Sequence, residues 1–117
     1  MIQYNNERGA IRISNEVIST LVGEAAASCF GVKGMAKRSV SDGLVHLLKR
    51  EMQYKGVYVT YGEDSSVSVE LHIIVDRDVN IPVICKSMIS EIRYRIREAT
   101  GIDLKTIDIF VDSIQIG

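Results

Sequence analysis

The most regular pattern of apolar and polar positions lies between Asn80 and Gly101. Apolar or small side chains recur there at the period of an α-helix and would form one stripe: Ile81, Ile84, Cys85, Met88, Ile89, Ile92, Ile96 and Ala99. Asn80 is suited to cap the start, Pro82 fits only a first helical turn, and Gly101 can adopt the left-handed conformation that ends a helix. The pattern predicts a long helix whose apolar stripe covers a sheet.

Two other segments alternate with a period of two, which is typical of β-strands. Residues 57–61 and 67–75 are separated by turn-forming residues and are predicted to pair as an antiparallel hairpin. A last strand follows the long helix, over residues 107–116. Its apolar phase slips at Asp112-Ser113, which predicts a bulge or a strand break at that point.

The first half of the chain is predicted to be mainly helical. Residues 1–8 form a polar, flexible leader, and residues 9–13 alternate as a short strand. Ser14 would cap a first helix with an apolar stripe made of Val17, Ile18, Leu21, Val22, Ala25 and Cys29. After an irregular connection, Ser41 would cap a second helix, whose inward side chains are Leu44, Val45, Leu47, Leu48 and Met52.

These elements together predict one α+β domain over residues 9–117, in the order β-α-α-β-β-α-β. We expect a mixed sheet of three or four strands, because a helix that connects two strands can return the chain parallel to its earlier direction. The first helix and the long helix would cover this sheet.

Composition narrows the classes of function. A chain of 117 residues can bury its own core without disulfides or metals. Its net charge of −1 gives no overall attraction to nucleic acid or acidic lipid and leaves only local basic patches for such contacts. Cys29 and Cys85 fall in or beside predicted helices and are expected to be unpaired apolar side chains. His46 and His72 lie on different elements with no cysteine at ligand spacing, so we expect neither a metal nor a cofactor.

The sequence shows no set of side chains that indicates catalysis. The serines lie in turn or cap contexts, and nothing marks either histidine as a base for one of them. Asp76 and Asp78 flank Arg77 just before the long helix, where helix capping explains them. We therefore expect that the chain is not an enzyme.

The first residues lack the basic region and apolar core of a signal peptide. No apolar run approaches the roughly 20 residues that span a bilayer. We therefore expect a cytoplasmic protein that does not insert into a membrane.

Two basic surfaces are candidates for contacts with a partner. Their members are Lys33, Lys37 and Arg38 in the connection after the first helix, and Lys86, Arg93, Tyr94 and Arg97 on one flank of the long helix. An exposed tyrosine beside arginines suits a protein–protein contact. The simpler interpretation of the flank is a solvated helix face whose long side chains cover apolar surface.

The segment Gly31-Val32-Lys33-Gly34 allows an alternative function. KH modules clamp a nucleic-acid backbone with a Gly-x-x-Gly loop between two helices, and the predicted element order follows one KH topology. Two glycines at this spacing are common by chance, however. In a KH module the second helix begins at the loop, whereas here the best cap, Ser41, comes seven residues after Gly34.

The order and spacing of several short segments resemble the alkaline shock protein family of mainly Gram-positive bacteria. These segments are Gly9-Ala-Ile-Arg-Ile-Ser-Asn-Glu-Val-Ile, Ala25-Ala26-Ala27, Phe30-Gly-Val-Lys-Gly-Met35, Gly43-Leu-Val, Lys55-Gly-Val-Tyr-Val59, Val69-Glu-Leu-His-Ile-Ile-Val75, Val79-Asn-Ile-Pro-Val83, Ala99-Thr-Gly101 and Ile107-Asp-Ile-Phe-Val111. The resemblance covers residues 9–116. The order and spacing of the segments together are specific for the family, whereas no single segment is. The chain departs from the family at Phe30, where proline often precedes the Gly-Val turn.

The resemblance implies a small cytosolic protein linked to cell-envelope stress. Members of the family are not known as enzymes, and some self-assemble or associate with a membrane-anchored protein of the same family. For this chain the resemblance implies a scaffold or adaptor that acts through protein–protein contacts as a homo-oligomer, with no catalytic residues to carry over.

Overall fold

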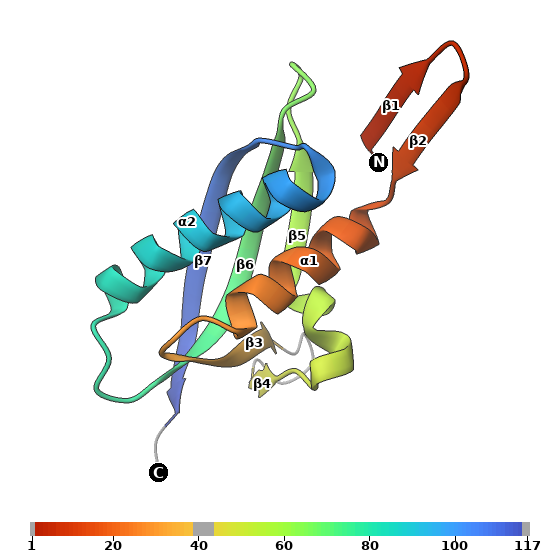
Figure 1. Cartoon of the computed structure of the whole chain (residues 1–117). Helices are drawn as coiled ribbons and strands as arrows, with labels where there is room; N and C mark the ends of the chain where they lie inside the picture. Colours follow the sequence, from red (N-terminus) through yellow and green to blue (C-terminus); the bar gives the residue numbers. More distant parts are fainter. Residues whose placement is uncertain (1, 39–43, 116–117) are drawn as a thin grey trace.

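The computed structural model describes residues 2–38 and 44–115. Its main feature is a mixed sheet of five strands with β6 at the centre (Figure 1). β6 (Val67–Asp76) pairs along its whole length with the parallel strand β7 (Leu104–Gln115). Its other edge is shared by two antiparallel strands, β5 (Val57–Tyr61) and β3 (Val32–Arg38). The short strand β4 (Val45–Leu47) pairs with β3. The α+β class and the mixed sheet are confirmed, with more strands than expected.

The β5–β6 hairpin has the predicted segments and direction. Its register runs from Val57 opposite Leu71 to Tyr61 opposite Val67. The phase slip in the last strand is also confirmed as a bulge. Val111 lies opposite Ile73, but Ser113 lies opposite the next residue of β6, so Asp112 is the extra residue in β7.

Two helices lie on one face of the sheet, α1 (Asn15–Ala27) and α2 (Ile81–Thr100) (Figure 1). Ser14 Oγ accepts a hydrogen bond from the backbone N–H of Val17 (3.3 Å), which caps α1. Asn80 caps α2 in the same way, and Gly101 ends it with φ 77°. The first helix and the long helix were both predicted with these caps.

The core lies between these helices and the sheet. Its fully buried members of larger size are Ile18, Val22, Met35, Val69, Leu71, Ile73, Val75, Met88, Ile92, Ile96 and Leu104. They come from the apolar stripes of both helices and from alternate positions of the strands. Burial of these stripes stabilises α1 and α2 in this position, because most of the stability of a helix in a protein comes from packing of its apolar face.

The helix predicted from Ser41 to Met52 is wrong. The described part of that segment forms β4 and then the 3₁₀-helix η1 (Arg50–Gly56), whereas Ser41 lies outside the described residues. Local apolar spacing suggested a helix, but pairing with β3 satisfies the backbone instead.

Two close contacts with β3 explain this outcome. The N–H of Leu48 donates to the carbonyl of Met35 (2.9 Å), just after β4 ends. Leu47 packs directly on Gly34: a Cβ at Gly34 would lie 2.9 Å from Leu47 Cδ1. A side chain at position 34 would force Leu47 to move, so glycine favours this close approach between the segment and β3.

The polar segment expected to be a flexible leader contains the strand β1 (Ile2–Asn6). It pairs antiparallel with β2 (Gly9–Ile13) to form a hairpin at one end of the molecule (Figure 1). Asn6 Oδ1 accepts from the N–H of Arg8 (2.8 Å) and fixes the turn. Alternation in β1 is limited to Ile2-Gln-Tyr-Asn, and its side chains are mostly exposed, so the strand owes its place to backbone pairing with β2.

Candidate functional site

A row of three rings crosses the sheet face that lies away from α1 and α2. We call this the open face and define it by Tyr58 on β5, His72 on β6 and Phe110 on β7, together with Glu70 and Asp112. The Tyr58 and His72 rings meet edge to face, with centroids 5.7 Å apart. The His72 and Phe110 rings are stacked, with centroids 4.8 Å apart. Strand register explains the row, because Phe110 lies directly opposite His72.

Both ring nitrogens of His72 contact carboxylates. Nδ1 lies 2.9 Å from Asp112 Oδ2, and Nε2 lies 3.0 Å from Glu70 Oε2. A protonated imidazole can donate to both carboxylates, whereas a neutral one carries a single N–H. The two contacts fix the ring in the middle of the row, so the open face has a defined shape and a polar centre.

The outer rings of the row remain accessible. Tyr58 is 47% exposed and Phe110 is 45% exposed. Helices cover only the other face of the sheet in the part of the chain that the structure describes (Figure 1). Exposed aromatic side chains grouped in this way are typical of contact surfaces rather than of a free surface.

The basic flank predicted on α2 is divided by the structure. Lys86 and Tyr94 are exposed, as the pattern predicts. Arg93 Nη1, however, donates to the carbonyl of Leu104, and Arg97 pairs with Asp103. These two arginines therefore join α2 to the start of β7, which leaves less of the flank available for a partner.

The second predicted basic surface is a strand and not a loop. Lys33 and Lys37 are exposed on β3, which ends at Arg38. Only Gly31 has a turn conformation, with φ 85°, and its carbonyl accepts from the N–H of Asp76 (2.9 Å). Gly34 is buried beneath Leu47. The Gly-x-x-Gly segment thus lacks the helix–loop–helix geometry of a KH clamp within residues 2–38 and 44–115.

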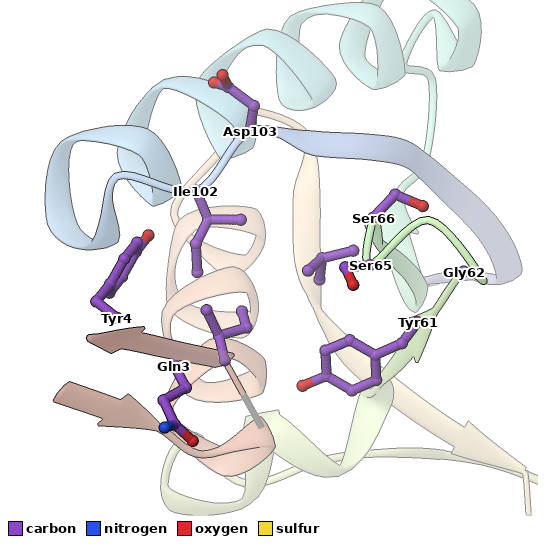
Figure 2. A pocket seen from close by; sticks show the side chains of 10 residues that line it. Gln3, Tyr4, Tyr61, Gly62, Ser65, Ser66, Ile102 and Asp103 are labelled. Carbon is purple, nitrogen blue, oxygen red and sulfur yellow. The ribbon is translucent and has the colours of Figure 1, made fainter. Parts of the chain in front are cut away.

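A cleft of about 490 Å³ separates the β1–β2 hairpin from the body of the protein. Tyr4 borders it from the hairpin, Tyr61 from the β5–β6 end, and Ile102 and Asp103 from the connection after α2 (Figure 2). The Tyr4 hydroxyl donates to the carbonyl of Thr100 (2.8 Å) and closes one end. Burial raises the pKa of Tyr61, whose hydroxyl donates to Asn15 Oδ1. Both tyrosine hydroxyls therefore have partners outside the cleft, and Asp103 pairs with Arg97 on α2.

The β5–β6 turn beside this cleft contains one strongly perturbed carboxyl group. Hydrogen bonds from the side chain and backbone of Ser66, and the charge of Lys105, lower the pKa of Asp64 to about 2. The backbone hydrogen bond is donated by the N–H of Ser66, whose nitrogen lies 3.1 Å from Asp64 Oδ1. These interactions stabilise a tight turn, in which Ser65 has φ 65°.

The two cysteines are unpaired and half-buried. Burial raises the pKa of the Cys29 thiol, and the negative charge of Glu91 raises it further. Burial also raises the pKa of Cys85. Both thiols are therefore poor nucleophiles at neutral pH.

The described residues contain no group of three histidine, cysteine or carboxylate side chains arranged to hold a metal ion. None of the described helices is long and apolar enough to cross a bilayer.

The open face could not be located from sequence. In the sequence, His72 lies within an alternating strand and Asp112 lies at a phase slip, and neither position indicates that the two side chains meet. The bulge at Asp112 brings its carboxylate to His72, and that placement depends on which residues of β6 and β7 are opposite each other. The one signal in the sequence was the slip itself.

Comparisons with known proteins agree on the family. A model of the alkaline shock protein family, described as having a cell envelope-related function, matches residues 3–116. The uncharacterized protein YloU of Bacillus subtilis is 30% identical over 116 residues, which are 98% of this chain and 96% of YloU. An uncharacterized protein of Streptococcus pyogenes serotype M6 is 29% identical over 98% of this chain and 95% of its own length.

Among solved structures, the fold is similar to that of the MamM CTD. Its copper form is 16% identical, with a TM-score of 0.56 over 87% of this chain and 88% of that chain. A variant of the same domain gives a TM-score of 0.57 at 15% identity, over 87% of this chain and 100% of that chain. At these identities the similarity concerns the fold alone.

Proposed function

Because this chain belongs to the alkaline shock protein family, whose described function is related to the cell envelope, we propose that it is a non-enzymatic adaptor. It acts in the cytoplasm in response to stress on the envelope, through protein–protein contacts and self-association. A membrane-anchored protein of the same family is the partner that the sequence resemblance suggests.

The observation that carries this proposal is the open face. It presents Tyr58 on β5 and Phe110 on β7 half-exposed on either side of β6, on the sheet face that the described helices leave uncovered. Aromatic side chains contribute large contact areas at small cost in conformational entropy, and they are enriched where proteins bind each other. A flat face with a rigid centre at His72 is suited to a protein surface rather than to a small molecule.

The interactions of His72 also support a role without catalysis. A general base needs a ring nitrogen within reach of the group it deprotonates. Both nitrogens of His72 are instead occupied by Glu70 and Asp112. The half-buried cysteines have raised pKa values, which makes them unsuitable as nucleophiles.

Affinity capture from the native cytosol tests the proposal. We expect the wild-type chain to recover envelope proteins or other members of its family, and a double variant with Tyr58→Ser and Phe110→Ser to lose them. The matched control carries Lys86→Glu and Tyr94→Ser, which change exposed side chains on α2, and should retain them. Circular dichroism of all three proteins must be the same.

A parallel capture with nuclease treatment separates a protein partner from nucleic acid. Recovered protein should not change when nuclease is added. If nucleic acid were recovered, and proteins only through it, the adaptor role would be contradicted. The same holds if the two double variants capture the same proteins as the wild type.

A further inference from the structure

β7 has one long edge that no described strand or helix pairs with. It has twelve residues and hydrogen bonds to β6 along one side only. Alternate backbone N–H and C=O groups of such a strand point away from the sheet and need partners. At the start of the edge, Arg93 donates to the carbonyl of Leu104, but no other described side chain takes a similar position further along β7.

At the opposite edge of the sheet, short strands and strand pairing leave little backbone open to another chain, whereas the edge at β7 has no such cover among the described residues. β3 is covered by β4, and β5 has only five residues. β7 has no proline, its one lysine is Lys105 near the start, and its bulge at Asp112 comes near the end. Natural proteins seldom leave a strand of this length open, because it is a template for another chain.

Side chains on both faces of β7 are incompletely buried. Phe110 on the open face is 45% exposed, and Ile114 is 47% exposed. Ile109 and Val111, which belong to the side that faces the helices, are only partly buried. A strand placed beside β7 would cover these side chains at the same time as it satisfies the backbone.

We infer that β7 pairs antiparallel with β7 of a second copy of this chain, which forms a continuous ten-stranded sheet across a two-fold axis. This inference rests on the self-association in the proposed function and names the surface that produces it. A second copy fits because it brings a free edge of the same length, and a two-fold axis lets each edge satisfy the other.

Charge selects the register of this pairing. Residues opposite each other in antiparallel strands point to the same face of the sheet, and side chains along one strand alternate between the faces. The two-fold axis of the dimer must therefore place one residue of β7 opposite the same residue of the second copy, and we name each register by that residue. An axis at Phe110 would place Asp108 opposite Asp112 of the second copy, and an axis at Asp108 would place Asp108 opposite itself. Like charges directly opposite are destabilising. An axis at Ile109 avoids both and lies close to the middle of the strand.

In the register centred on Ile109, Asp108 lies opposite Phe110 of the second copy. Ile107 then lies opposite Val111, and both are apolar. The two open faces become one surface, because an axis perpendicular to the sheet keeps equivalent faces on the same side. An adaptor built in this way would present two aromatic rows to its partner.

Disulfide formation between single-cysteine chains tests the register. Both native cysteines are replaced (Cys29→Ser and Cys85→Ser), and one chain then carries Asp108→Cys, the other Phe110→Cys. Both positions are exposed, so the variants should fold. After mixing and mild oxidation, the mixed disulfide should form faster than either self-pair, because opposite residues are closer than diagonal ones.

The control is Thr60→Cys, an exposed position on β5 at the far edge of the sheet. The mixed disulfide should form about a thousandfold faster than the Thr60→Cys dimer, because pairing raises the effective thiol concentration from micromolar to millimolar. Equal rates for all pairs would overturn the inference. Faster self-pairing by Phe110→Cys than mixed pairing would overturn the register.

Light scattering separates this inference from the proposed function. If light scattering shows that the wild type is a dimer but the cysteine variants of β7 do not cross-link, pairing through β7 is refuted and self-association is retained. Efficient mixed cross-linking together with no captured envelope protein would refute the adaptor role and support the β7 interface.

Discussion

His72 shows how a single residue acquires a role from its neighbours. In the sequence it is one polar position of an alternating strand. In the folded protein its ring lies between Tyr58 and Phe110, and its nitrogens contact Glu70 and Asp112. These five side chains come from three strands, and their meeting depends on the register of those strands.

Asp64 allows a pH test at the same scale. Its pKa is lowered from 3.8 to about 2, first by the Ser66 side chain, then by the Ser66 backbone and Lys105. Because the folded pKa is lower than the unfolded one, the folded state binds fewer protons, and the contribution to stability is present above about pH 4 and lost as pH falls through about 2. Asp64→Asn should remove this contribution.

Urea unfolding of wild type and Asp64→Asn across this range measures the effect. Their difference in the free energy of unfolding should be constant from about pH 5 to pH 7 and shrink below about pH 4. Glu63→Gln, in the same turn, is the matched control and should give no such change. A difference that grows as pH falls would contradict the assigned interactions.

At the scale of elements, the contacts between α2 and the start of β7 involve two arginines that the sequence suggested for another role. Arg93 and Arg97 were candidates for contact with a partner, with a solvated helix face as the simpler interpretation. They instead bind the carbonyl of Leu104 and the carboxylate of Asp103, both in the segment that follows α2. The helix thereby positions the first residue of β7, from which the register of the whole parallel pair follows.

Arg93→Glu should therefore lower stability. The variant loses a charged hydrogen bond to a backbone carbonyl and places a negative charge beside that oxygen, so we expect a loss of about 1–2 kcal/mol in the free energy of unfolding. Lys86→Glu, on the exposed part of the same flank, should change it by less than about 0.5 kcal/mol. Urea unfolding at neutral pH measures both, and equal losses would show that Arg93 has no special role.

At the scale of the whole molecule, the shape is elongated. The radius of gyration is 15.0 Å, whereas a compact chain of this length would have about 13 Å. The β1–β2 hairpin at one end of the molecule accounts for the extension (Figure 1). Apart from the covalent connection to α1, the hydrogen bond from the Tyr4 hydroxyl to the carbonyl of Thr100 joins the hairpin to the body.

Hydrogen exchange should follow this arrangement. A two-stranded hairpin is marginal by itself, so amides of β1 and β2 should exchange at least about a hundredfold faster than those of β6, which is paired on both edges. Mass spectrometry of peptides from residues 2–13 and 67–76 would show it. Equal protection would mean that the hairpin is held by contacts beyond those within one chain.

Sequence alone determined those parts of the fold that depend on local chemistry. The helical stripe and caps of α1 and α2, and the alternation of β5 and β6, are properties of consecutive residues, so they could be predicted with their approximate limits. The bulge at Asp112 was visible for the same reason. The family, too, could be recognised from the order of short segments.

Only the tertiary structure decided the segment from Val32 to Gly56, the β1–β2 hairpin and the open face. β3 and β4 form because they pair with each other, with Leu47 packed closely on Gly34, and β1 forms because β2 supplies its backbone partners. The row of Tyr58, His72 and Phe110 exists because three strands meet in one register. Contacts between residues far apart in sequence have no periodic signature, and they fix which surfaces this protein can offer to a partner.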